Sequence, residues 1–302
     1  MTGEFAVLQR LRDLLPGPPP GETWIGDDAA VVSSPPGALV LTADAVVAGV
    51  HFDLSLVGLD DVGWKAMSVA LSDVAAMGCV PQYALVTVCA PSDTDVDLLY
   101  KGVAEAVEVY ACPVVGGDLV EAAVLMVSVA VTGDTGHRSP VLRSGAAPGD
   151  RLFVTGRLGA SAAGLRRLRA GEARDEDVTV SAHRRPWARL SEGRVARAAG
   201  ATAMVDVSDG LATDVRHLAE ASGVGVALDA VPVAPRATLD DALGGGDDYE
   251  LVFTASNPAH VAATFAQAGL RQPIPFGVCT ADGRCLLAGA PLPQAGWEHR
   301  FT

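Results

Sequence analysis

The chain carries five short motifs in which an aspartate stands beside a glycine or at the end of a predicted strand. Carboxylate oxygens are the ligands that Mg²⁺ prefers, and loops at strand ends are where binding residues gather. Taken singly, each motif is more typical of a turn or a helix cap than of a metal site. Their number in one chain favours a site built from aspartates. The motifs are Gly26-Asp27-Asp28, Thr42-Ala43-Asp44, Gly116-Gly117-Asp118, Asp206-Val207-Ser208-Asp209-Gly210 and Gly245-Gly246-Asp247-Asp248.

A further aspartate, Asp73, lies inside a predicted helix over residues 60–77. It shares an apolar stripe with Ala66, Ala70 and Met77, at spacings of three or four residues. The polar stripe of the same helix, which contains Lys65, lies about 110° away. A carboxylate on an apolar stripe is costly unless it is paired or bound to a metal. This position favours a functional role for Asp73.

The motif that begins at Asp206 follows a predicted strand over 203–207 and opens a predicted helix over 210–222. Ser208 or Asp209 can cap that helix, and pure capping is one reading of the motif. The other reading is a phosphate site, because a helix N-terminus presents N–H groups and partial positive charge to anions. Two flanking carboxylates would then hold Mg²⁺ beside the phosphates.

The charge balance agrees with a metal-assisted phosphate site. The chain has 302 residues, 22 basic and 36 acidic side chains and a formal net charge of −14, which argues against nucleic acid or anionic membranes as partners. Its only lysines are Lys65 and Lys101, so bound Mg²⁺ is the expected means of neutralising a polyphosphate. The lysine-bearing phosphate loop G-x-x-x-x-G-K-[ST] is absent from the sequence. Arg143 can be a phosphate fork or a surface arginine.

The expected fold class is α/β (α+β), with strands and helices mixed in both halves. We expect two mixed-sheet domains, residues 1–135 and 136–302, joined by a Gly-, Pro- and Ser-rich linker at about 133–150. Asp282-Gly283 predicts a hairpin between strands 277–280 and 285–288. The five cysteines have no C-x-x-C spacing and predict reduced thiols. With no secretory signal at residues 1–10 and no long apolar run, a cytoplasmic protein is expected.

Taken in order, the motifs closely resemble the thiamine-monophosphate kinase family. The matching segments are 26–30, 42–52, 71–78, 115–118, 143–145, 206–211 and 245–251. The resemblance covers nearly the whole chain. It implies an N-terminal α/β domain that pairs with its twin in a homodimer, a C-terminal α/β domain, and ATP with several Mg²⁺ ions in the cleft between the domains. It also relates the chain to aminoimidazole ribonucleotide synthetase and selenophosphate synthetase.

The resemblance also implies roles for single residues. The metal ligands would be Asp27, Asp28, Thr42, Asp44, Asp73, Asp118, Asp206 and Asp209. The ATP contacts would be Tyr110, Gly117, Asp118, Arg143 and Ser208. Thiamine phosphate would contact His51, Asp247 and Trp297. The residue types alone leave His51 evenly divided between a substrate contact and a half-buried core histidine, and they favour packing over recognition for Trp297. No separate catalytic residue is expected outside the metal and ATP sites.

Three positions depart from the family pattern. Ala43 stands where threonine is usual, Leu119 replaces a frequent threonine, and Asp247 is one methylene shorter than the usual glutamate. The expected activity is ATP-dependent, Mg²⁺-dependent phosphorylation of thiamine monophosphate to thiamine diphosphate, the last step in making that cofactor, by in-line transfer. The alternatives are another ATP-using enzyme of the same superfamily and a non-catalytic nucleotide-binding regulator.

Overall fold

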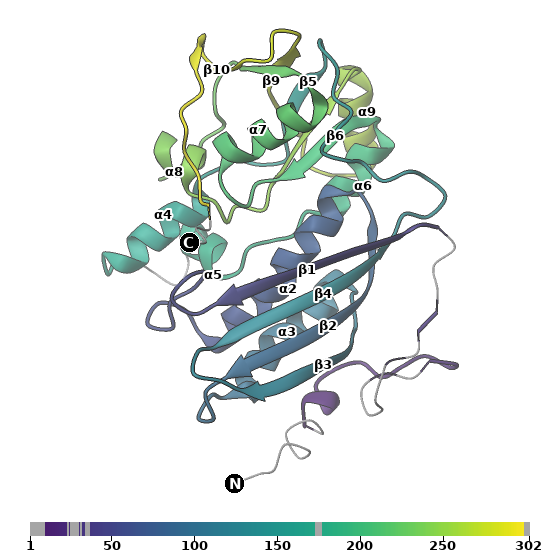
Figure 1. Ribbon diagram of the computed structural model, residues 1–302, viewed down its shortest axis with the longest axis vertical. Helices are drawn as coiled ribbons and strands as arrows, with labels where there is room; N and C mark the ends of the chain where they lie inside the picture. Colours follow the sequence, from purple (N-terminus) through teal and green to yellow (C-terminus); the bar gives the residue numbers. More distant parts are fainter. Residues whose placement is uncertain are drawn as a thin grey trace. The chain divides into compact units, whose positions relative to one another are not determined.

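The computed structural model describes residues 10–22, 24, 30, 32–33, 37–172 and 177–298. Asp27 and Asp28, two of the expected metal ligands, lie outside these residues. The chain divides into two compact units, Met1–Val74 with Val80–Arg138, and Ala75–Cys79 with Ser139–Thr302. Both units contain a mixed sheet with helices, which confirms the α/β (α+β) class (Figure 1).

The first unit is a four-stranded sheet with two helices on one of its faces (Figure 1). Valines at every second position of the inner strands, such as Val86, Val88, Val127 and Val129, are fully buried on that face. The sheet order is β1-β4-β2-β3, so β1 and β3 are the two edges. The elements are β1 (Leu39–Val47), α2 (Leu59–Ala76), β2 (Val80–Ala90), α3 (Val96–Tyr110), β3 (Val114–Glu121) and β4 (Met126–Asp134).

The opposite face of this sheet is apolar and exposed. Leu41 is 69% exposed and Leu85 is 46% exposed. The strand register places these side chains, and three further ones, on the same face, away from the buried valines. The exposed apolar residues of this open face are Leu39, Leu41, Val80, Leu85 and Val120. Several exposed apolar side chains on one face of a sheet are typical of an interaction surface.

The second unit is a seven-stranded sheet in the order β11-β10-β7-β9-β5-β8-β6. Its strands are β5 (Arg151–Val154), β6 (Ala201–Asp206), β7 (Gly225–Leu228), β8 (Leu251–Ala255), β9 (Ile274–Thr280), β10 (Cys285–Leu287) and β11 (Ala290–Pro291). Its helices are α4 (Ala160–Arg169), α5 (Val178–Arg184), α6 (Leu190–Ala198), α7 (Leu211–Ser222), α8 (Leu239–Gly244) and α9 (Pro258–Gln267).

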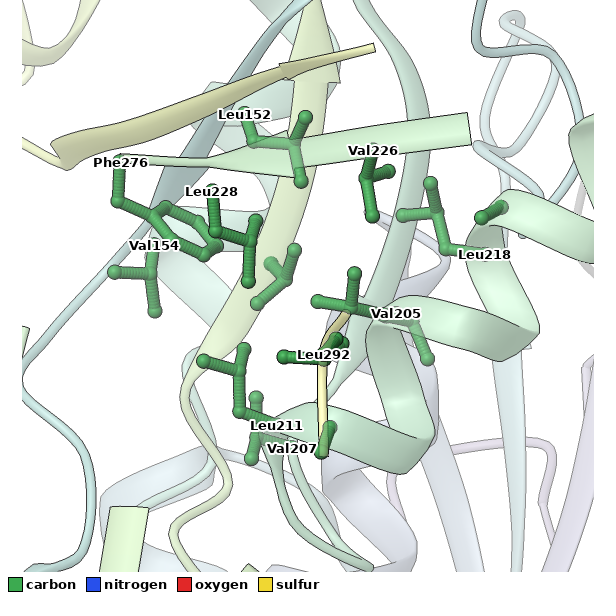
Figure 2. Close-up of a cluster of buried hydrophobic side chains, with 14 of the residues drawn as sticks. Leu152, Val154, Val205, Val207, Leu211, Leu218, Val226, Leu228, Phe276 and Leu292 are labelled. Carbon is green, nitrogen blue, oxygen red and sulfur yellow. The ribbon is translucent and has the colours of Figure 1, made fainter. Parts of the chain in front are cut away.

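Alternating residues of the second sheet enter two different cores. On one side, Val205 and Val226 pack with Leu211 and Leu218 of α7 (Figure 2). On the other side, Phe153 and Phe253 stack with their ring centroids 5.2 Å apart and join the core that contains residues of α6 and α9. The central strands of this sheet are therefore buried on both faces, which fixes their register.

The predicted hairpin around Asp282-Gly283 is wrong. The turn exists, and the Asp282 side chain accepts a hydrogen bond from the Thr280 hydroxyl at 2.7 Å. However, β7 lies between β9 and β10, antiparallel to the first and parallel to the second. Gly225 makes this insertion possible, because a Cβ there would stand 2.4 Å from Thr280 Oγ1 and 2.6 Å from the Arg284 carbonyl oxygen.

Among the helices of the described part of the chain, none combines the length and the apolar character that a bilayer crossing requires.

Candidate active site

Three segments of the second unit meet at the end of β6. The Asp247 N–H donates to the Ser208 carbonyl at 2.8 Å, and the Tyr249 N–H donates to the Val207 carbonyl at 2.9 Å. The Trp297 N–H donates to the Asp209 carbonyl at 3.0 Å. These bonds bring together expected metal, ATP and substrate residues from positions 206–209, 247 and 297.

Glycines allow the three segments to approach this closely. Gly246 has φ +65°, and a Cβ there would lie 2.5 Å from the Ser208 carbonyl oxygen. Gly210 has φ +114°, and its Cβ would lie 2.9 Å from the Gly244 Cα. Any side chain at these positions would both strain the backbone and separate the segments. Gly210 and Gly246, which flank Asp209 and Asp247, are therefore needed for the close packing of these segments.

Carboxylates are concentrated at the N-terminus of α7. Asp206, the last residue of β6, is 4% exposed, and Asp214 in the first turn of α7 is 2% exposed. Burial, reinforced by the negative charges of Asp206 and Asp209, raises the pKa of Asp214 to about 8. The Gly210 N–H donates to its carboxylate at 3.1 Å. The Asp214 carboxyl group is therefore a buried acid at a helix N-terminus, beside the negative charges of Asp206 and Asp209.

Sequence reasoning missed Asp214. The signal that identified Asp73 was present here too, because Asp214 shares the buried side of its helix with Leu211, Val215 and Leu218. Both aspartates interrupt an apolar helix stripe.

The loop that carries Asp247 has an unusual backbone. Asp247 and Tyr249 both adopt the left-handed region, with φ 58° and 49°. Each such residue costs about 1–3 kcal/mol and persists only where its surroundings hold it in place. The Tyr249 hydroxyl donates to Asp247 Oδ1 at 2.7 Å.

The two acidic residues that alternate with them, Asp248 and Glu250, anchor the loop to other elements. Asp248 accepts the Gly159 N–H at 2.6 Å and so caps α4, and burial raises its pKa to about 7. Glu250, 5% exposed, accepts two hydrogen bonds from the Arg189 guanidinium, at 2.6 and 3.1 Å. The loop is therefore fixed on both sides of Tyr249.

In the first unit, the structure brings Thr42 and Asp73 together. The Thr42 hydroxyl donates to the Asp73 carboxylate, linking β1 to α2. Asp44 lies two residues farther along β1 and therefore points to the same face as Thr42. The polar stripe of α2 is buried as well, since Lys65, Ser68 and Ser72 are 2% exposed or less.

His51 belongs to a tight loop after β1. Its Nδ1 accepts the Val47 N–H at 3.1 Å, and its carbonyl accepts a hydrogen bond from Lys65 Nζ at 3.0 Å. Because Nδ1 is an acceptor, the neutral ring carries its proton on Nε2. One of the two lysines therefore supports this loop from inside the unit, a role that sequence reasoning did not assign.

The other residues expected to contact ATP lie on β3, at the end of α3 and in the segment before β5. Gly117 and Asp118 are exposed on β3, at the sheet edge opposite β1. Tyr110 is buried at the end of α3, with its hydroxyl 3.0 Å from Ser68 Oγ. Arg143 is exposed, and its carbonyl accepts a hydrogen bond from the Ser222 hydroxyl at 3.1 Å.

Within the described ranges, no three His, Cys, Asp or Glu side chains form a ready metal-binding group. Among the described residues, the aspartates expected to bind metal lie in both units: Asp44, Asp73 and Asp118 in the first, and Asp206 and Asp209, near Asp214, in the second.

Comparison with known proteins identifies the family. Residues 26–135 match the AIR synthase related protein, N-terminal domain, and residues 147–285 match the corresponding C-terminal domain. A thiamine-monophosphate kinase of Bacillus subtilis (strain 168) is 36% identical over 254 residues, which cover 78% of each chain. This chain belongs to the thiamine-monophosphate kinase family.

Solved structures of the thiamine-monophosphate kinase family have the same fold. The crystal structure of the enzyme from Stenotrophomonas maltophilia K279a has 30% sequence identity and a TM-score of 0.83, covering 96% of this chain and 98% of its own. The structure of AaThiL complexed with AMPPCP and TMP has 33% identity and a TM-score of 0.78, covering 99% and 97%. The likeness to this family thus extends over nearly the whole chain.

Proposed function

We propose that this protein transfers the γ-phosphoryl group of ATP to the phosphate of thiamine monophosphate and releases thiamine diphosphate and ADP. The observation that carries the proposal is the meeting of the Asp206–Asp209 motif, the Asp247 loop and Trp297 in the second unit. A relative of the same family has been solved with the ATP analogue AMPPCP and with TMP. The family relationship and this packing support the same reaction.

This reaction requires the protein mainly to position the two substrates and to stabilise the negative charge of their phosphates. The attacking group is an oxygen of an anionic phosphate, so no strong general base is needed. Two polyanions must be held in line against their repulsion. Bound Mg²⁺ would supply charge neutralisation on both phosphates and on the transferring group.

Two sets of aspartates, one in each unit, are suited to bind such ions. In the first unit, Asp44 and Asp73 lie on the helix side of the sheet, and the Thr42 hydroxyl orients the Asp73 carboxylate. In the second, Asp206 and Asp209 stand close enough to Asp214 to raise its pKa. We assign seven aspartates as Mg²⁺ ligands: Asp27, Asp28, Asp44, Asp73, Asp118, Asp206 and Asp209. Asp214 would be a buried neighbour of the last two and not itself a ligand. Thr42 would act through Asp73 or as a ligand.

The nucleotide would contact Ser208 beside the α7 N-terminus, where N–H groups favour phosphate, and Gly117, Asp118, Arg143 and Tyr110. Since Tyr110 is buried against Ser68, we expect it to act through packing rather than through its hydroxyl.

Thiamine monophosphate would contact His51, Asp247 and Trp297. The Nε2–H of a neutral His51 can donate to an acceptor on the substrate. The Asp247 carboxylate suits the cationic and amino-bearing rings of the substrate better than its phosphate. The departures at Ala43, Leu119 and Asp247 leave the remaining acidic residues intact, so an active enzyme is expected.

We further propose a homodimer formed through the open face of the first sheet. Its exposed apolar residues include Leu41 and Leu85, and Asp118 lies on the same face. Asp118 on β3 is separated from Asp44 on β1 by two strands, about 14 Å at the usual strand spacing. One ion cannot bind both within a protomer, so Asp118 either holds a different ion or serves the site of the second copy, and we propose the second.

Complementation between protomers tests this arrangement. Co-expressed Asp118→Asn and Asp44→Asn protomers would form dimers with one doubly altered site and one intact site, and activity would reappear. If Asp118 acts within its own protomer, both sites stay altered and the mixed dimers stay inactive. Leu41→Asp should give a monomer in light scattering, and a dimer that persists would contradict the open face as the interface.

We propose a cytoplasmic location, supported by the five cysteines, all of which are free thiols.

The reaction itself is tested with purified protein, ATP, Mg²⁺ and thiamine monophosphate, followed by chromatography. Equal formation of thiamine diphosphate and ADP, abolished by a chelator, is the expected result. ATP consumption without thiamine diphosphate would indicate a sister enzyme of the superfamily. ATP binding without turnover would indicate a regulator.

A further inference from the structure

The side chains of Tyr249 and Asp247 are joined by a hydrogen bond that no sequence motif explains. The Tyr249 hydroxyl donates to Asp247 Oδ1 at 2.7 Å, and Tyr249 is 4% exposed. Residues two apart in a strand point to the same side, but here both backbones are left-handed, with φ 58° and 49°. This conformation turns the Tyr249 hydroxyl toward the Asp247 carboxylate.

The neighbouring contacts hold the tyrosine in place. Its N–H donates to the Val207 carbonyl at 2.9 Å, and the Val207 N–H donates to the Glu250 carbonyl at 2.8 Å. The flanking acidic side chains are held too, by the Gly159 N–H at Asp248 and by Arg189 at Glu250. Tyr249 is therefore buried with its backbone fixed, so its hydroxyl is placed to orient the Asp247 carboxylate.

We propose that Tyr249 is a positioning residue that sets the orientation of the Asp247 carboxylate toward the ring portion of thiamine monophosphate. This inference rests on the proposed function, in which Asp247 contacts the substrate. The Asp247 side chain has two rotatable bonds, and an unrestrained carboxylate would have to lose that freedom on binding. The hydroxyl imposes the restriction before the substrate arrives, which lowers the entropic cost of binding.

The substrate class follows from the charge of the group being positioned. A carboxylate repels the phosphate of thiamine monophosphate and attracts its cationic thiazolium ring or its amino group. Tyr249 should therefore affect recognition of thiamine monophosphate and leave recognition of ATP unchanged. A residue needed only for folding would alter both.

The test compares Tyr249→Phe, Asp247→Ala and the double variant by steady-state kinetics. We expect Tyr249→Phe to raise the KM for thiamine monophosphate about tenfold, the loss of one hydrogen bond to a charged group, with little change in the KM for ATP. The decisive measurement is the double variant. If Tyr249 acts through Asp247, removing its hydroxyl in the Asp247→Ala background should change nothing further.

The control is Tyr100→Phe, which removes another buried tyrosine hydroxyl, from α3 of the first unit. It should leave the KM for thiamine monophosphate unchanged. Equal KM values for wild type and Tyr249→Phe, or additive effects in the double variant, would overturn the positioning role. If Asp247→Ala itself leaves that KM unchanged, the substrate role of Asp247 fails and the inference falls with it. A wild-type protein that makes no thiamine diphosphate would overturn the proposed function instead.

Discussion

The backbone N–H of Trp297 donates a hydrogen bond to the carbonyl of Asp209 over 3.0 Å. The two residues are 88 positions apart in the sequence. Gly296 makes the contact possible, because its φ is +131° and a Cβ there would stand 3.0 Å from the same carbonyl oxygen. The segment near the C-terminus is thus fixed against the loop that carries two expected Mg²⁺ ligands, Asp206 and Asp209.

This contact predicts that Trp297 contributes to substrate binding. The Trp297 side chain is 55% exposed although its backbone is anchored, so a ring of the substrate can pack against the indole. Trp297→Ala should raise the KM for thiamine monophosphate by about 10-fold, corresponding to about 1.4 kcal/mol of lost contact. Steady-state kinetics with each substrate varied in turn measures this effect.

Trp187→Ala is the matched control, because Trp187 is also exposed, at 45%. It should leave both KM values near those of the wild type. An unchanged KM in Trp297→Ala would show that the tryptophan serves packing alone.

The carboxylates at the α7 N-terminus predict a second result. Asp209→Asn keeps the size of the side chain but removes its charge, so kcat should fall ~100-fold and the Mg²⁺ concentration needed for half-maximal rate should rise. The measurement is a Mg²⁺ titration of the initial rate at saturating ATP. Asp229→Asn, at an aspartate whose side chain is 66% exposed, is the control. Equal Mg²⁺ curves for wild type and Asp209→Asn would contradict the metal assignment.

Local rules were enough to single out part of the candidate site. The carboxylate on an apolar stripe identified Asp73, and the structure shows it accepting a hydrogen bond from Thr42. The strand-to-helix motif identified Asp206 and Asp209, which lie at the end of β6 and before α7. Both signals depend only on residues within a few turns of the chain, which is why the sequence reveals them.

Other features depend on long-range pairing, which local rules do not contain. The turn at Asp282 predicted a hairpin, but pairing with β7 decided the strand order. Gly116 and Gly117 have low strand propensity, so only the pairing of β3 with β2 makes this segment a strand. The left-handed backbone of Tyr249 exists because other segments hold the loop, so no local signal predicts its bond to Asp247.

The partly buried carboxyl of Asp248 predicts a pH effect on stability. Burial raises its pKa from 3.8 to about 7 in the folded protein. Between these two values the folded protein holds a proton that the unfolded chain has lost, so this group's contribution to stability falls as the pH rises. The unfolding free energy of wild type minus that of Asp248→Asn should therefore fall from pH 4 to pH 7, by at most ~1.4 kcal/mol per pH unit, and level off above.

Urea unfolding at a series of pH values measures this difference. Asp282→Asn is the control, because hydrogen bonds from Thr280 and Arg284 lower the pKa of Asp282 to about 2. Its difference from wild type should be flat above pH 5. A flat or rising difference for Asp248→Asn would mean that the α4 cap holds Asp248 ionised at all these pH values.

The ion pair between Glu250 and Arg189 holds the loop that carries Asp247 and Tyr249. Breaking it should lower the stability of the protein, which distinguishes the role of Glu250 from that of Tyr249. Glu250 has a side chain only 7% exposed and accepts two hydrogen bonds from Arg189. Glu250→Gln leaves the partly buried Arg189 guanidinium with only the longer 3.9 Å contact to Glu192, so the free energy of unfolding should fall by about 2 kcal/mol. Asp229→Asn, which breaks an exposed pair with Arg151, should cost less than about 1 kcal/mol.

Because Glu250 anchors the loop on one side of Tyr249, its loss should lower stability and raise the KM for thiamine monophosphate together, whereas Tyr249→Phe should raise that KM with little change in stability. Stability near that of the wild type in Glu250→Gln would show that the loop is held by its backbone bonds to Val207 and Ser208 alone.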